Sequence, residues 1–145
     1  MSRNFLSLVA FLIAVVAMVL LIQRHHLVAT TPLLIGVQIA AALLMIWARV
    51  TFGFRSFHAA ASTSEGELVT TGPYHYLRHP IYASIIYFIW AGQVHKPDVV
   101  SLSLAGIATI ALFIRMILEE EFLKTRYPDY TAYMKHAKRV IPFVI

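Results

Sequence analysis

The chain has no cysteine among its 145 residues, and few of its residues are charged. Without cysteine it can form no disulfide, no thiolate metal site and no cysteine nucleophile. Charged residues make up 13% of the chain and hydrophobic residues 59%. Soluble domains have about 25% charged and about 45–50% apolar residues. The composition therefore indicates a membrane protein, and the length predicts one membrane domain over residues 1–145.

The chain contains four long runs of apolar residues. A helix needs about 20 apolar residues to cross a bilayer, with a range of about 17–25. The sequence predicts an all-α membrane protein with four transmembrane helices, at about residues 5–22, 32–50, 80–94 and 99–118. The third run is short for a span, and local thinning of the bilayer accommodates a short span.

Basic residues are divided unequally between the connections of these runs. Arg24 and Lys96 lie in two short connections. The other basic residues lie at the opposite ends of the runs: Arg3, Arg49, Arg55, Arg78, Arg115, Lys124, Arg126, Lys135, Lys138 and Arg139. Cytoplasmic loops are rich in Lys and Arg. We therefore expect both termini, the long loop 51–79 and the tail 119–145 to lie in the cytoplasm.

Aromatic and basic residues alternate in the tail 119–145. Because the tail directly follows a span, we expect amphipathic helices on the membrane surface, with lipids and not nucleic acid as partners. Pro128 is expected to divide the tail into two pieces. The adjacent histidines at 25 and 26 have no further ligands near them in sequence, so no metal site is predicted.

Two short segments concentrate the residues that suit chemistry. Residues 71–82 contain an Arg-His-Pro turn, and residues 115–120 contain one arginine and two glutamates. The apolar runs beside them are joined only by residues 95–98, so their helices are predicted to be antiparallel neighbours. The turn therefore meets the glutamates at one membrane face. Charge at a bilayer edge is costly, which makes a functional site the default hypothesis.

The chemistry available there follows from residue type and spacing. Pro80 suits the first turn of a helix, and the N–H groups of that turn can hold an anion or a carboxylate. Arg115 and Glu119 are four residues apart and share a helix face. Glu119 or Glu120 can bind a diol or an amine through charge-assisted hydrogen bonds. Tyr82 can stack on an aromatic ring or approach a cation.

The segments 68–74, 78–82, 115–120, 127–133 and 139–143 together resemble the integral-membrane methyltransferases. These include the isoprenylcysteine carboxyl methyltransferases and the phospholipid N-methyltransferases. The resemblance covers about half of the chain. It implies an S-adenosylmethionine site between the long loop, the start of the third helix and the end of the fourth.

The resemblance and the residue chemistry together assign the expected site. The expected cofactor-binding residues are Glu67, Leu68, Val69, Tyr74, Arg78, His79, Pro80, Ile81, Tyr82, Glu119 and Glu120. Arg115 and Glu119 are the expected catalytic residues, and Arg115 and Arg49 are expected to bind the substrate. The acceptor is expected to be amphiphilic and to enter from the lipid: the carboxylate of an isoprenylcysteine-like thioether, or a lipid amine. An amine must lose a proton, for which His79 or a glutamate is the expected base.

Two other functions are compatible with the sequence. Membrane sterol reductases have a similar C-terminal region and use NADPH, although no Arg/Lys cluster suited to a 2′-phosphate is visible here. The second alternative function is not enzymatic: a small helical membrane protein that binds a partner. The sequence leaves the acceptor and the oligomeric state open.

Overall fold

The computed structural model describes residues 3–53, 67–142 and 144. The regular elements in these residues are α1 (Arg3–Gln23), α2 (Pro32–Phe52), the short 3-10 helix η2 (Gly72–His75), α3 (Pro80–His95), α4 (Val99–Arg126) and α5 (Tyr130–His136). No β-strand occurs in the described part of the chain. The predicted all-α class is confirmed for these residues.

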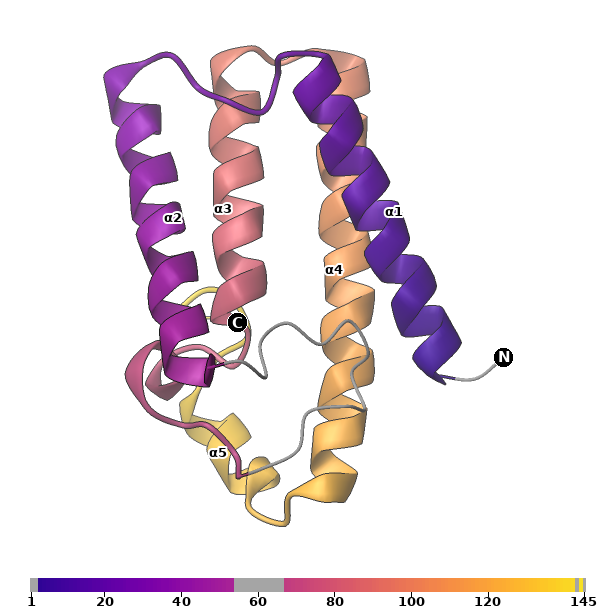
Figure 1. Cartoon of the computed structure of the whole chain (residues 1–145), viewed down its shortest axis with the longest axis vertical. Coiled ribbons are helices and arrows are strands. Elements are labelled where there is room, and N and C mark those ends of the chain that lie inside the picture. Colours follow the sequence, from indigo (N-terminus) through magenta and orange to yellow (C-terminus); the bar gives the residue numbers. More distant parts are fainter. Residues whose placement is uncertain (1–2, 54–66, 143, 145) are drawn as a thin grey trace.

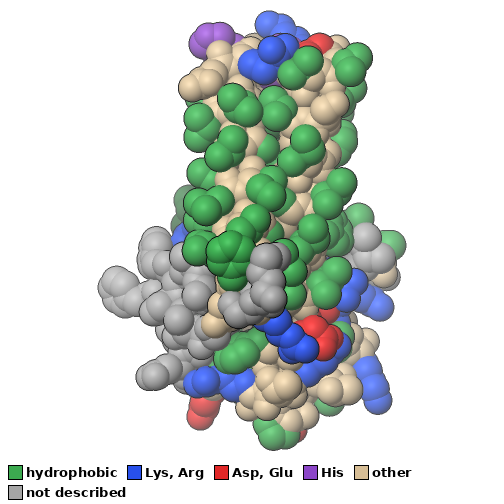
Figure 2. Space-filling view, turned by 90° about the vertical axis from the view of Figure 1, so that its right-hand side faces the viewer, with side chains coloured by type: hydrophobic (Ala, Val, Ile, Leu, Met, Phe, Trp, Pro, Cys, Tyr) green, Lys and Arg blue, Asp and Glu red, His purple; other side chains and the backbone are tan. Residues whose placement is uncertain are grey.

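Three of the four predicted membrane spans are confirmed as helices that are long and apolar enough to cross a bilayer: α1, α2 and α4. The fourth, α3, is apolar but has only 16 residues. Its crossing of the membrane therefore stays a prediction. Large apolar side chains are exposed along the bundle, and Figure 2 shows them as a belt between two charged ends.

The four long helices stand side by side in the order α2, α3, α4, α1 (Figure 1). α1 packs along α4 and α2 packs along α3, and the predicted neighbours α3 and α4 are also in contact. Buried alanines line the contact between α1 and α4: Ala10, Ala14, Ala17, Ala105 and Ala108. Small residues let helix backbones approach closely in a membrane, so α1 is held tightly against α4.

Polar side chains fix the end of the bundle that lies far from the tail. Gln38 Nε2 donates a hydrogen bond of 2.8 Å to the Leu27 carbonyl. A Cβ atom at Gly92 would lie 2.4 Å from the same carbonyl oxygen, so only glycine permits this close approach of the α1–α2 connection to α3. Asp98 accepts from two backbone N–H groups in the first turn of α4, at 3.1 and 3.2 Å, and it pairs with Arg24 at 3.2 Å.

The basic residues separate between the two ends as the charge count predicts. Arg24 and Lys96 lie at the end formed by the short connections, and the other described basic residues lie toward the end that carries the tail. Arg55 lies outside the described residues. Which end faces the cytoplasm stays a prediction.

α4 continues well beyond the predicted span 99–118 and ends at Arg126. Both glutamates of the 115–120 segment therefore lie inside this helix and not in a separate tail. The predicted break at Pro128 is confirmed, because α5 begins only at Tyr130 and is seven residues long.

The tail then returns to the start of α3. Leu77 and Lys138 form an isolated parallel β-bridge. The backbone N–H of Arg78 donates to the Lys138 carbonyl at 2.6 Å, and the N–H of His79 donates to the Arg139 carbonyl at 3.1 Å. Two segments that are distant in sequence are thereby joined beside the end of α4.

Candidate active site

The start of α3 has no side-chain cap. His79 stands at the N-cap position with φ −127° and ψ 58°, outside helical geometry, and Pro80 opens the helix as predicted. Within the part of the chain that the structure describes, the His79 side chain makes no capping hydrogen bond, in contrast to Asp98 at the start of α4. The first-turn N–H groups of α3 are therefore suited to a bound anion.

A compact hydrogen-bonded group, called here the Glu119 cluster, consists of Tyr82, Arg115 and Glu119. The Tyr82 hydroxyl donates to Glu119 Oε1 at 2.5 Å. Arg115 Nε donates to the Tyr82 hydroxyl at 2.5 Å and to Glu119 Oε1 at 3.1 Å. The Arg115 side chain is 4% exposed and that of Glu119 is 18% exposed. The carboxylate is the more accessible member of this ion pair.

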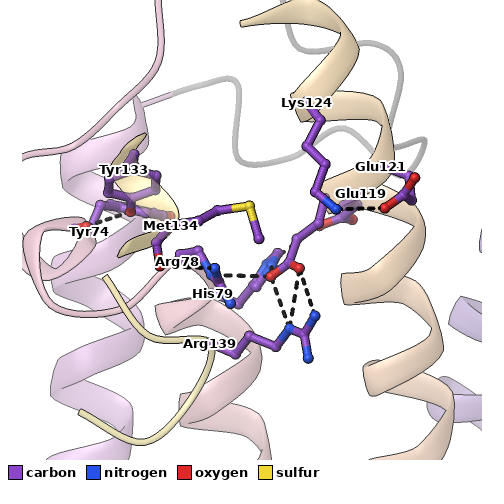
Figure 3. Close-up of polar contacts among 10 residues, drawn as sticks. Tyr74, Arg78, His79, Glu119, Glu121, Lys124, Tyr133, Met134 and Arg139 are labelled. Carbon is purple, nitrogen blue, oxygen red and sulfur yellow. Dashed lines mark hydrogen bonds and ion pairs between the residues drawn. The ribbon is translucent and has the colours of Figure 1, made fainter. Parts of the chain in front are cut away.

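A second group, the Glu120 cluster, consists of Glu120 with Arg78, His79 and Arg139. Figure 3 labels the three nitrogen-bearing members. Arg139 Nη2 donates to Glu120 Oε2 at 2.9 Å, and Arg139 Nε lies 3.1 Å from Oε1. Arg78 Nε lies 3.2 Å from Glu120 Oε1. The Glu120 side chain is 2% exposed, so three nitrogen-bearing side chains enclose one buried carboxylate.

His79 lies between the two clusters. Its Nε2 atom is 3.3 Å from Glu120 Oε1, and its Nδ1 atom is 3.8 Å from Glu119 Oε2. Glu119 and Glu120 are consecutive residues of α4, so their side chains point about 100° apart around the helix. The His79 ring contacts both carboxylates because it lies in the angle between them. A carboxylate accepts and does not donate, so Nε2 carries the hydrogen in the contact with Glu120.

η2 places Tyr74 next to this site and against the end of α2. The Tyr133 hydroxyl donates to the Tyr74 carbonyl at 2.5 Å, and the Tyr74 ring lies 5.4 Å from that of Phe52 (Figure 3 shows the Tyr74–Tyr133 contact). Burial raises the pKa of the Tyr74 hydroxyl, with the Glu119 charge adding to the rise and the Arg49 charge opposing it. Tyr74 is therefore a neutral group within electrostatic range of both charges.

Gly72 is required where η2 meets α2. Its φ is +58°, and a Cβ atom there would lie 2.8 Å from Thr51 Oγ1 and 3.3 Å from Trp47 Nε1. A side chain at this position is strained both by the backbone conformation and by the neighbours. The glycine thus allows η2 to dock on the last turns of α2.

The structure brings together most of the predicted site residues. The two clusters contain Arg78, His79, Tyr82, Arg115, Glu119 and Glu120, and Pro80 and Ile81 belong to the same first turn of α3. Glu67, Leu68 and Val69 lie in the segment that leads to η2, and Arg49 lies in the last turn of α2. These four residues are members of neither cluster.

Three contacts were not anticipated from the sequence. Arg115 Nη1 donates to the backbone carbonyl of Ser7 at 3.5 Å, and Arg115 Cζ lies 5.0 Å from the centre of the Phe11 ring. Arg139 closes the Glu120 cluster from the tail, and its hydrogen bond to Glu120 raises the pKa of Arg139. Ser7 is a polar residue in an apolar run, which is a weak signal, and nothing in the sequence distinguishes Phe11 from its neighbours.

The chain was compared with models of protein families. The model of a family described as phospholipid methyltransferase matches residues 26–130. The match contains α2, η2, α3 and α4 and leaves α1 outside. No curated protein and no solved structure matches the chain.

Proposed function

Because the chain belongs to the phospholipid methyltransferase family, a family of membrane methyltransferases, we propose that it transfers a methyl group from S-adenosylmethionine to a lipid amine. The observation that carries this proposal is the Glu119 cluster, which joins Tyr82 of α3 to Arg115 and Glu119 of α4. Tyr82 lies in the first turn of α3, whose N-cap residue His79 makes no capping hydrogen bond among the described residues. This arrangement supports a shared site for donor and acceptor at this end of the bundle.

The residues at this place fit S-adenosylmethionine. When bound, that molecule supplies a methyl group on a positively charged sulfur. The uncapped N–H groups of α3 suit its carboxylate. Glu119 suits its amine or its ribose diol, and the rings of Tyr74 and Tyr82 suit the adenine or the sulfonium. We retain Pro80, Ile81 and the backbone of Glu67, Leu68 and Val69 as further proposed contacts.

Of the two glutamates, we assign the donor contact to Glu119. Glu120 is 1% exposed and is already enclosed by Arg78, His79 and Arg139. A ligand could reach it only by displacing the ion pair with Arg78 and the hydrogen bonds from His79 and Arg139. We therefore propose that Glu120 and Arg78 hold the turn and the tail in place, and that Glu119 binds the ligand.

A lipid amine attached to a phosphate suits the acceptor side. Guanidinium groups bind phosphate in fixed geometry, and Arg115 and Arg49 are the proposed partners of this phosphate. The head-group nitrogen is an ammonium at neutral pH, so it would have to give up a proton before it could form the N–C bond in exchange for the S–C bond of the donor. We propose that His79 takes this proton, because Nε2 carries a hydrogen toward Glu120, which leaves the lone pair of the neutral ring at Nδ1. Nδ1 faces the Glu119 cluster.

We further propose that α3 crosses the membrane with the other three helices and that the site faces the cytoplasm. α3 lies between α2 and α4 (Figure 1). These two neighbours also contact the lipid, so α3 is not surrounded by lipid alone. The basic residues gathered at the site end support this orientation. The acceptor then enters from the surrounding lipid and does not need to cross water.

An isoprenylcysteine carboxylate is the second candidate acceptor, because Arg115 suits a carboxylate and an ionised carboxylate needs no base. The family match favours methyl transfer over reduction with NADPH and over a function without catalysis.

The test is methyl transfer by purified protein in lipid nanodiscs. We expect radiolabel from S-adenosylmethionine to enter phosphatidylethanolamine and to resist mild alkali, as an N-methyl group does. Label lost in alkali would indicate a methyl ester and the carboxylate acceptor. Absence of transfer to either acceptor, together with absence of S-adenosylhomocysteine binding, would overturn the proposal.

A further inference from the structure

We infer that α1 supplies the acceptor-side wall of the site: Phe11 positions the guanidinium of Arg115, and the Ser7 hydroxyl binds the anionic oxygens of the acceptor head group. This inference rests on the proposed function. It concerns a helix that lies outside the part of the chain matched by the family model, residues 26–130.

Aromatic rings lie near the Arg115 guanidinium from two helices. Its Cζ atom is 5.0 Å from the centre of the Phe11 ring of α1 and 5.9 Å from that of Tyr82 of α3. Its Nη1 atom donates to the Ser7 carbonyl at 3.5 Å. Lysine and arginine side chains near a membrane edge ordinarily extend toward water. These contacts hold Arg115 inward instead, since its side chain is only 4% exposed.

The Ser7 hydroxyl is the second observation. Ser7 is 1% exposed, and among the described residues its Oγ has no hydrogen-bond partner. Buried polar side chains nearly always have a partner, so an exception calls for an explanation. The backbone of the same residue accepts from Arg115. A head group that carries anionic oxygens and lies against Arg115 would give the Ser7 hydroxyl an acceptor.

The geometry assigns different tasks to the two sides of the site. Glu119, Tyr74 and the start of α3 form the donor side, whereas Ser7, Phe11 and Arg115 form the acceptor side. Changes on α1 should therefore affect the acceptor and leave the donor unaffected. A merely structural role of these residues would change both, or neither.

The first test replaces the Phe11 ring. We expect Phe11→Leu to weaken binding of short-chain phosphatidylethanolamine about 5–30-fold, as loss of a desolvated cation–π contact implies, and to raise the KM for this acceptor similarly. The Kd for S-adenosylhomocysteine should not change. Phe11→Tyr keeps the ring and should restore the acceptor affinity. Phe113→Leu is the matched control, since Phe113 is a partly buried phenylalanine packed against the core.

The second test is Ser7→Ala. If the hydroxyl were only structural, its removal would leave acceptor binding unchanged and would not lower stability, because a buried hydroxyl without a partner is unfavourable. We expect acceptor affinity to fall at least about 3-fold with the melting temperature maintained.

The inference would be overturned if neither Phe11→Leu nor Ser7→Ala changed the acceptor affinity. It would also be overturned if the control Phe113→Leu lowered the acceptor affinity as much as Phe11→Leu does. A wild-type protein that fails to bind the short-chain lipid would do so as well. Lipid binding that depends on Phe11, without any methyl transfer, would support the inference and refute the proposed function.

Discussion

Glu119 and Glu120 are adjacent and chemically identical, yet their surroundings differ sharply. The Glu119 side chain is 18% exposed and has one cation, Arg115, within hydrogen-bond distance. The Glu120 side chain is 2% exposed and is enclosed by Arg78, His79 and Arg139 (Figure 3). A carboxylate with this many partners is suited to holding segments together. Its more accessible neighbour, Glu119, is suited to binding a ligand. The comparison therefore assigns a structural role to Glu120 and a ligand-binding role to Glu119.

The largest effect is expected on stability, from Glu120→Ala. Removal of one partner of a buried ion pair leaves the other charge uncompensated and costs about 3–5 kcal/mol. Here the uncompensated charge is Arg78, whose side chain is 10% exposed. The melting temperature of the purified protein in detergent should fall clearly.

Glu121→Ala is the matched control for this change. Glu121 is exposed and pairs only with the neighbouring Lys124 in the described residues, so its removal should leave the melting temperature unchanged. Equal melting temperatures for the Glu120 and Glu121 variants would show that the Glu120 cluster does not hold the tail.

The next effect is expected on catalysis, from Glu119→Gln. Hydrogen bonds to charged groups contribute about 1.5–3 kcal/mol, so kcat/KM for methyl transfer should fall roughly 10–100-fold. The melting temperature should change much less than in Glu120→Ala. A variant that keeps full activity would place the donor elsewhere.

A smaller effect is expected from Tyr82→Phe. The hydroxyl bridges Arg115 and Glu119, but these two residues also contact each other directly at 3.1 Å. Loss of the bridge should cost about 1 kcal/mol, or roughly 5-fold in kcat/KM. A loss as large as that of Glu119→Gln would mean that the Tyr82 hydroxyl itself contacts a reacting group.

The smallest effect is expected from Arg139→Lys. This variant keeps the charge and loses the forked contact with Glu120. Because the Arg139 side chain is 36% exposed, water screens the pair, and we expect a loss of stability of only about 0.5–1 kcal/mol. Thermal melting of Arg139→Lys and Glu120→Ala under the same conditions compares the two losses of stability. An equal loss in both variants would make Arg139 the main partner of Glu120.

Local signals in the sequence were enough to predict much of this end of the molecule. The start of α3 at Pro80 and the break at Pro128 both depend on backbone chemistry that single residues determine. The pairing of Arg115 with Glu119 follows from a spacing of four along one helix.

The partners of Glu120 could not be predicted in this way. Arg139 reaches it only because the tail returns to the start of α3 through the bridge between Leu77 and Lys138. Such a return depends on tertiary packing and has no periodic signature. The contact of Phe11 with Arg115 was missed for a related reason: the rotation of α1 about its own axis is set by the alanines between α1 and α4.

A set of three titrations tests most directly whether Glu119 binds the ligand and Glu120 holds the structure. S-adenosylhomocysteine is titrated calorimetrically into wild-type protein, Glu119→Gln and Glu120→Gln, with the melting temperature recorded for each. We expect wild type to bind, Glu119→Gln to bind at least about 10-fold more weakly with little change in melting temperature, and Glu120→Gln to bind nearly as tightly with a lower melting temperature. Full binding by Glu119→Gln, or selective loss of binding in a stable Glu120→Gln, would contradict the account.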